Sequence, residues 1–239
     1  MLSRTSIYRT CVVIIGAAAA WPSVAGKAVI SQTANQPAYS GTYKVSGANK
    51  LSGREEFKIA RAGDFGSIET NGELTDAYGS RATRTRLDLN KGKLARYSSS
   101  ATTGPAQRTY TIEFGPDSAQ VKIESRGEKT ERTLQVPEDA VLIDNDVWAQ
   151  YQGLLSRYDM AKKGVQNFTI FVPGGGLRVY NAQVEFEGSV SYKLHGENIV
   201  ANNFVVMLAD AYEVDIVADG TGVPLKAERY FDNKKAVLQ

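Results

Sequence analysis

Few side chains in this sequence have the types and spacing that catalysis requires. His195 is the only histidine, and with Leu194 before it and Gly196-Glu197 after it, it is expected where a strand passes into a turn. A catalytic base also needs a nucleophile and an orienting group, and the sequence identifies neither. We therefore expect His195 to be a surface or hairpin residue. We expect no catalytic residues, and a protein that is not an enzyme.

Three acidic residues, Asp139, Asp144 and Asp146, could suggest a site for a hard cation. Their spacing lacks the glycine and the terminal glutamate of a calcium loop. Helix capping explains them better, because Asp144 and the adjacent Asn145 have short side chains that can accept bonds from a first helical turn. One histidine, and a single cysteine at position 11, argue against a zinc site. We expect neither a metal nor a cofactor.

Two further stretches have some features of binding sites. Residues 173–176, Pro-Gly-Gly-Gly, resemble a phosphate loop only in their glycines, since no Lys-Ser/Thr follows and another strand begins there. A flexible hairpin connection is the better interpretation. A basic cluster in residues 81–96 is a solvated outer face by default, with attraction to lipid phosphates or another acidic envelope partner as the alternative.

The stretch 136–159 is the one that reads as a long helix. Asp144 and Asn145 are the candidate caps, and the helix is expected to end between Asp159 and Gly164, where Lys162-Lys163 supplies positive charge. Apolar side chains recur within it at spacings of three and four, which indicates one buried stripe. The candidate lining of a ligand cavity is taken from this stripe: Trp148, Tyr151, Leu154, Leu155 and Tyr158.

The rest of the chain from residue 39 alternates apolar and polar residues with period two, interrupted by short Gly, Asn, Asp and Pro turns. This pattern predicts about a dozen or more antiparallel strands in a meander, with the helix between two sets. So many strands must twist, curl or close. We expect a mainly β protein, a strongly curved antiparallel sheet or incomplete barrel wrapping one central helix. A two-sheet β-sandwich with a helix at one end is the alternative.

The N-terminal residues have the layout of a secretory signal peptide. Arg4 and Arg9 precede an uncharged run that is too short for an ordinary membrane span, and small residues precede a cleavage point after Ala25. We expect residues 1–25 to be the signal peptide and 26–239 to form a single β-rich domain. A cysteine-free mature chain favours a bacterial periplasmic or secreted protein, without a transmembrane segment after cleavage.

Charge argues against one class of partner. Removing residues 1–25 leaves 26 basic residues (28 − 2) against 26 acidic ones. A nucleic-acid-binding protein would normally carry a basic excess, so we expect no nucleic acid.

Several segments carry a family resemblance. They are 53–59 (GREEFKI), 136–146 with its Val-Pro and Val-Leu-Ile-Asp-Asn-Asp, 151–159 within the predicted helix, and 168–173 with Phe-Val-Pro. The chain resembles uncharacterised bacterial exported proteins of the domain-of-unknown-function families DUF6134 and DUF3108. The resemblance implies a curved antiparallel sheet around a helix, similar to the periplasmic lipoprotein carriers LolA and LolB, and it transfers no catalytic residue.

The expected function is non-enzymatic. We expect a periplasmic protein that binds an apolar ligand, a lipid or acyl chain, between the concave sheet and the helix. The alternative is a structural or protein-interaction module of the envelope without a small ligand. A space between sheet and helix that is fully packed by Trp148, Tyr151, Leu154 and Leu155 would exclude the first.

Overall fold

The strands of the computed structural model follow the alternation of the sequence closely. The model describes residues 37–174 and 176–239, so the predicted signal peptide and its cleavage point lie outside the described residues. Its strands are β1 (Pro37–Ser46), β2 (Ser52–Ala62), β3 (Phe65–Asp76), β4 (Gly79–Asn90), β5 (Lys93–Thr103), β6 (Ala106–Phe114), β7 (Ser118–Ser125), β8 (Glu128–Gln135), β9 (Val141–Leu142), β10 (Val165–Val172), β11 (Arg178–Leu194), β12 (Glu197–Leu208), β13 (Tyr212–Ala218), β14 (Pro224–Arg229) and β15 (Lys234–Leu238).

These strands form one 15-stranded sheet, in the order β8-β7-β6-β5-β4-β3-β2-β1-β15-β14-β13-β12-β11-β10-β9. Each strand is antiparallel to its neighbour, except that β9 runs parallel to β10. The predicted antiparallel meander is confirmed, and the two-sheet sandwich is not the observed topology. We call β1–β8 the first half of the sheet and β9–β15 the second half; they meet where β1 pairs with β15.

Tight turns between neighbouring strands explain the meander. Lys91-Gly92, Arg126-Gly127 and His195-Gly196 each place two consecutive residues at positive φ. That conformation is typical of two-residue hairpins whose twist matches the flanking strands. His195 has a φ of 50° and is exposed, so the prediction of a hairpin histidine is confirmed.

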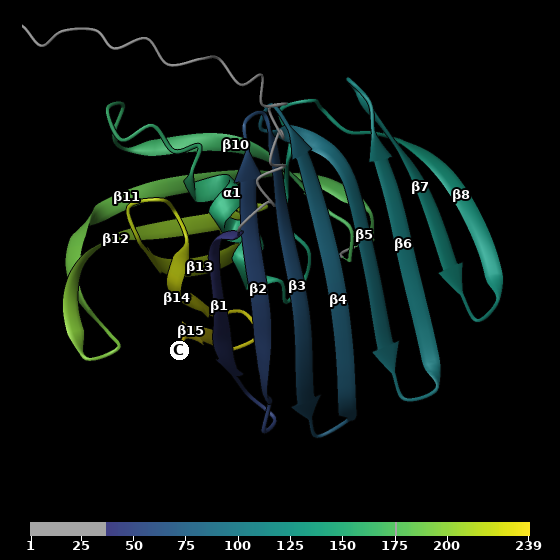
Figure 1. The fold of residues 1–239 in the computed structure, drawn as a ribbon, viewed down its shortest axis with the longest axis horizontal. Coiled ribbons are helices and arrows are strands. Elements are labelled where there is room, and N and C mark those ends of the chain that lie inside the picture. Colours follow the sequence, from purple (N-terminus) through teal and green to yellow (C-terminus); the bar gives the residue numbers. More distant parts are fainter. Residues whose placement is uncertain (1–36, 175) are drawn as a thin grey trace, which may run out of the picture. The chain divides into compact units, whose positions relative to one another are not determined.

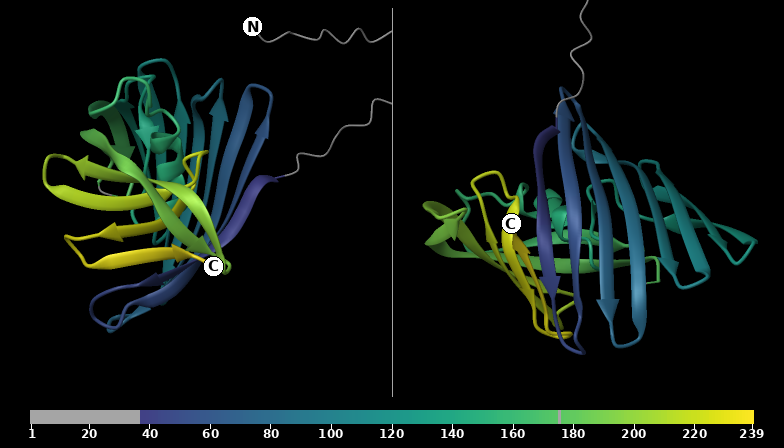
Figure 2. Two further views of the ribbon diagram at one scale, coloured as in Figure 1. Left: turned by 90° about the vertical axis from the view of Figure 1, so that its left-hand side faces the viewer. Right: turned by 60° about the horizontal axis from the view of Figure 1, so that its bottom comes forward.

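Curvature of the sheet brings the two halves over a common interior. Figures 1 and 2 show the strands of the second half crossing those of the first, with α1 (Tyr151–Leu155) between them. Buried side chains from both halves and from the helical segment belong to a single hydrophobic cluster, which includes Tyr43, Tyr97, Trp148, Phe171 and Ile216. A curved sheet around a central helical segment is therefore observed.

The helix is much shorter than the sequence predicts. One 3₁₀ turn, η1 (Trp148–Gln150), leads directly into α1, which ends at Leu155, so the prediction of a helix running to between Asp159 and Gly164 was wrong. After it, Asp159 exchanges two hydrogen bonds with the side chain of Gln166 at the start of β10. These bonds hold the backbone outside a helical path. Lys163 and Gly164 have positive φ, as a turn into β10 requires.

The predicted N-caps were also wrong. The residue at the cap position is Val147, which has no side-chain capping bond. Asp144 and Asn145 lie before the cap position. Asp146, which follows them, has a φ of 60°, and this value is incompatible with a right-handed helix. The carboxylate of Asp144 accepts instead from the backbone N–H of Asn145 (2.8 Å) and of Gly174 (2.7 Å).

The strand β11 is continuous over 17 residues, with an irregularity in its pairing with β12 between Phe186 and Gly188. Within the described residues no helix has the length and apolar character needed to cross a bilayer.

Candidate functional site

The five residues predicted to line a ligand cavity lie mainly in the packed core. Trp148, Leu154, Leu155 and Tyr158 are buried, and Tyr158 packs edge-on against Phe204 of β12. Tyr151, also buried, lines a cavity of about 270 Å³ on the side of the second half. Most side chains of the apolar stripe therefore pack against other side chains of the protein.

Glu55, on β2, holds the start of η1. Its two carboxylate oxygens accept hydrogen bonds from the backbone N–H groups of Trp148 (2.8 Å) and Ala149 (3.0 Å). Glu55 is buried, and burial raises its pKa to about 8, although the two hydrogen bonds act in the opposite direction. The Glu55 side chain, which is distant in sequence, thus accepts the N–H bonds that a local N-cap side chain would otherwise accept.

Asp144 is a second buried carboxylate near the start of the helical segment. The Tyr97 hydroxyl on β5 donates to it at 2.5 Å, in addition to the N–H groups of Asn145 and Gly174. Burial raises the pKa of Asp144 despite these hydrogen bonds. Since both oxygens are used internally, Asp144 fixes the loop before the helix to β5 and to residues after β10.

Asp146 has the opposite electrostatic setting. Arg81 on β4 (2.7 Å), Arg229 on β14 (2.5 Å) and Lys234 on β15 (2.7 Å) all contact its carboxylate. Burial alone would raise the pKa of Asp146, but the three positive charges and the Lys234 hydrogen bond lower it. Asp232 also pairs with Arg229 and Lys234, so this cluster is a connected ion network of three positive and two negative side chains.

In the part of the chain that the structure describes, no group of three or more His, Cys, Asp or Glu side chains could hold a metal ion. Asp139, Asp144 and Asp146 do not converge on one point. Asp144 and Asp146 face the separate partners described above, and Asp139 uses its backbone carbonyl to accept from Arg157.

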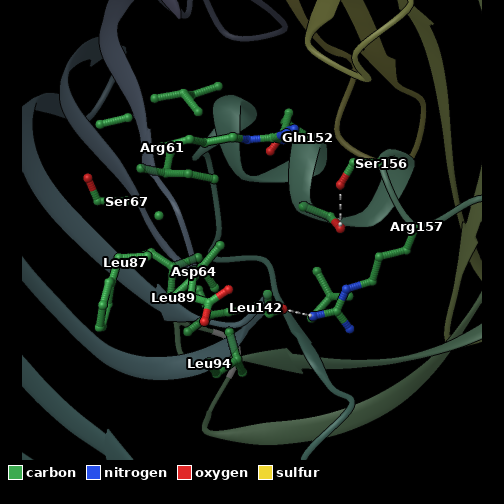
Figure 3. Close-up of a pocket in the computed structure, with 18 of the residues that line it drawn as sticks. Arg61, Asp64, Ser67, Leu87, Leu89, Leu94, Leu142, Gln152, Ser156 and Arg157 are labelled. Atoms are coloured by element: carbon green, nitrogen blue, oxygen red, sulfur yellow. Dashed lines mark hydrogen bonds between the residues drawn. The ribbon is translucent and has the colours of Figure 1, made fainter. Parts of the chain in front are cut away.

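A second cavity, of about 320 Å³, lies between the ends of β2–β5 and residues 152–157 (Figure 3). Its size falls at the lower end of the range of about 300–1,000 Å³ that small-molecule sites occupy. Its apolar walls come from Ile59, Ile68, Leu87, Leu89, Leu94, Val141 and Leu142. We call it the strand-end cavity.

The strand-end cavity also has polar lining residues. Arg61, Asp64, Ser67, Gln152, Ser156 and Arg157 contribute to it. On β2, alternation places Arg61 on the same face as Glu55, Phe57 and Ile59, but at the exposed end of the strand. Figure 3 shows Arg157 extending from the segment after α1 toward Leu142 and Leu94. The arrangement combines an apolar interior with two guanidinium groups in its lining.

Arg157 is held in place by backbone carbonyls. It donates from Nη1 to the carbonyl of Asp139 (2.5 Å) and from Nη2 to that of Gly92 (2.8 Å). Partial burial lowers the pKa of Arg157, while the nearby charge of Asp139 acts in the other direction. Among the described residues, no carboxylate lies within ion-pair distance of Arg157 or Arg61.

Sequence reasoning missed three of these residues, Glu55, Arg61 and Arg157. A signal for the first was present, because Glu55 shares its face of β2 with the buried Phe57 and Ile59. A charged residue in an apolar row indicates a buried partner. Arg61 continues the same row. Arg157 had no comparable signal, since its role depends on the helix ending two residues earlier.

Comparisons with protein-family models, with curated proteins and with solved structures found no match.

Proposed function

We propose that this protein is a non-enzymatic carrier or sensor that binds a small apolar molecule, a lipid or acyl chain, in the strand-end cavity. The observation that carries the proposal is the apolar interior of this cavity between the concave face of the first half and the end of the helical segment. The site differs from the predicted one, because Trp148, Leu154, Leu155 and Tyr158 belong to the packed core.

The expected family likeness and the expected location also belong to this proposal. A single curved sheet around a short helical segment is compatible with a likeness to LolA and LolB and to the exported families named above. We also propose a periplasmic or secreted location in a bacterium, on the basis of residues 1–25. Envelope protein interaction without a ligand is the alternative function.

Gly153 offers a direct test. It lines the strand-end cavity, and a Cβ added there would meet only Val141 Cγ1, at 3.5 Å. A larger side chain can therefore occupy the cavity without displacing backbone. We expect wild-type protein to bind a fluorescent fatty acid stoichiometrically and Gly153→Leu to lose that binding, as measured by fluorescence titration.

Gly153→Ala is the matched control. Its single added methyl group leaves most of the cavity open, and the loss of a helical glycine is expected to stabilise the fold by up to about 1 kcal/mol. It should bind like the wild type. Equal binding by Gly153→Leu, or no binding of the fatty acid or of extracted envelope lipids by the wild type, would remove the carrier proposal and favour the interaction module.

A further inference from the structure

The lining of the strand-end cavity contains more positive charge than its own residues neutralise. Arg61 and Arg157 contribute two positive charges and Asp64 one negative charge. None of the three makes an ion pair with another described residue. The charge of Asp139, which is outside the lining, acts on Arg157 but forms no ion pair with it. A net positive charge beside an apolar interior is complementary to a ligand with one anionic end and one apolar end.

Arg157 has the hydrogen-bonding capacity to bind such an end. A guanidinium group has five N–H donors in a fixed plane. Two of its nitrogens donate to the carbonyls of Asp139 and Gly92, which orient the group, and the remaining donors have no acceptor among the described residues. Planar guanidinium groups bind carboxylates through two parallel hydrogen bonds.

The two arginines differ in burial and in tethering, which suits them to different roles. Arg157 is half-buried and tethered by two hydrogen bonds, whereas the side chain of Arg61 is exposed and forms no ion pair among the described residues. A tethered guanidinium loses little conformational entropy on binding, so it is the group suited to fix the ligand. Arg61 is suited to attract it over a longer distance.

We propose that the ligand of the strand-end cavity is a single-chain carboxylate, with the apolar chain among Ile59, Ile68 and Leu87 and the carboxylate on Arg157. The inference rests on the proposed function and specifies its ligand class. Phosphate-bearing lipids with two chains fit less well, because the cavity volume of about 320 Å³ is at the small end of ligand sites.

The test compares two ligands of equal chain length, decanoate and decanol, by calorimetric titration below their micelle-forming or solubility limits. The wild type should bind decanoate at least about tenfold more tightly, the difference expected from a charge-assisted hydrogen-bonded pair. Arg157→Ala should lose this preference while decanol affinity stays unchanged. Arg157→Lys should keep part of it, since lysine has the charge but not the planar fork.

Two controls keep the outcomes distinct. Arg132→Ala removes an exposed charge from β8 and should leave the preference unchanged. Thermal melting shows whether each variant is folded. If Arg157→Ala does not fold, the decanoate preference of Arg157→Lys decides the test. Equal binding of decanoate and decanol by the wild type overturns the carboxylate inference but leaves the proposed function standing. Failure of both ligands to bind counts against the proposed function itself.

Discussion

Three acidic residues near the helical segment show how the surroundings of a carboxylate decide its effect. Glu55 and Asp144 are buried among hydrogen-bond donors without a positive charge in contact, and their pKa values are raised. Asp146 contacts three positive side chains and its pKa is lowered. Folding therefore favours the protonated form of the first two and the ionised form of the third.

The pH dependence of stability should report Glu55 directly. Its pKa of about 8 in the folded protein lies above the ordinary value of 4.5. Between these values the folded protein retains a proton that the unfolded chain releases. The free energy of unfolding should therefore fall as pH rises through this window, by up to about 1.4 kcal/mol per pH unit from this group, and level off above it.

Urea unfolding at several pH values in that window gives the measurement. Glu55→Gln should flatten the dependence, because glutamine does not titrate and can still accept one of the two backbone hydrogen bonds. The control is Glu56→Gln, an exposed neighbour on the opposite face of β2. An unchanged slope in Glu55→Gln would show that other groups, such as Asp144, control the pH dependence.

At the scale of elements, the loop before the helical segment is fixed to both halves of the sheet. Glu55 and Arg81 belong to the first half, and Arg229 and Lys234 to the second. All four contact either the start of η1 or Asp146. The short helix therefore owes its position to these contacts more than to its own propensity, as expected for a helical run far below the length at which isolated helices are stable.

Asp146→Asn tests this fixation. It removes the charge that Arg81, Arg229 and Lys234 share, but asparagine tolerates the φ of 60° that the position requires. We expect a loss of about 1–3 kcal/mol in the free energy of unfolding, because Arg81 loses its ion partner, whereas Arg229 and Lys234 keep Asp232. Asp210→Asn is the matched control, with a φ of 55° and an exposed side chain. Equal stability of the two variants would contradict the expectation.

The sequence predicted some of this architecture and not the rest, for physical reasons. Alternation in β2 or β13 predicts strands because one face is buried and the other solvated. The stripe containing Tyr151 and Leu154 predicted helical periodicity and burial, but not where the helix ends. Its start depends on Glu55, 93 positions away, and the segment after it on the hydrogen bonds between Asp159 and Gln166. The apolar row of β2 indicates that Glu55 has a buried partner, but not which backbone groups that partner comprises. The strand-end cavity was unpredictable for the same reason.

At the scale of the molecule, one core joins both halves. Its hydrophobic cluster includes Tyr43 and Ile68 from the first half and Val206 and Ile216 from the second, with Trp148 between them. If the two halves separate, the apolar side chains on the concave faces of both become exposed. This continuity favours a single cooperative unfolding transition over separate melting of the halves.

Two signals can test that cooperativity. In a Trp21→Phe background, Trp148 is the only tryptophan, and its fluorescence reports on the interior between the halves. Far-ultraviolet circular dichroism reports on the whole sheet. We expect the two denaturant curves to coincide. A fluorescence change at lower denaturant than the loss of strand signal would mean that the halves separate first.

The pairing of β1 with β15 has a consequence for how the chain is made. Tyr43 and Leu238 are partners although they are 195 positions apart (238 − 43). A ribosome synthesises the whole first half, and then most of the second, before β15, the second neighbour of β1 after β2, exists. Throughout that time the growing chain presents a free strand edge and an uncovered apolar face, the features that promote aggregation. We therefore expect the incomplete chain to aggregate more readily than the complete one, and chaperone binding to reduce that aggregation.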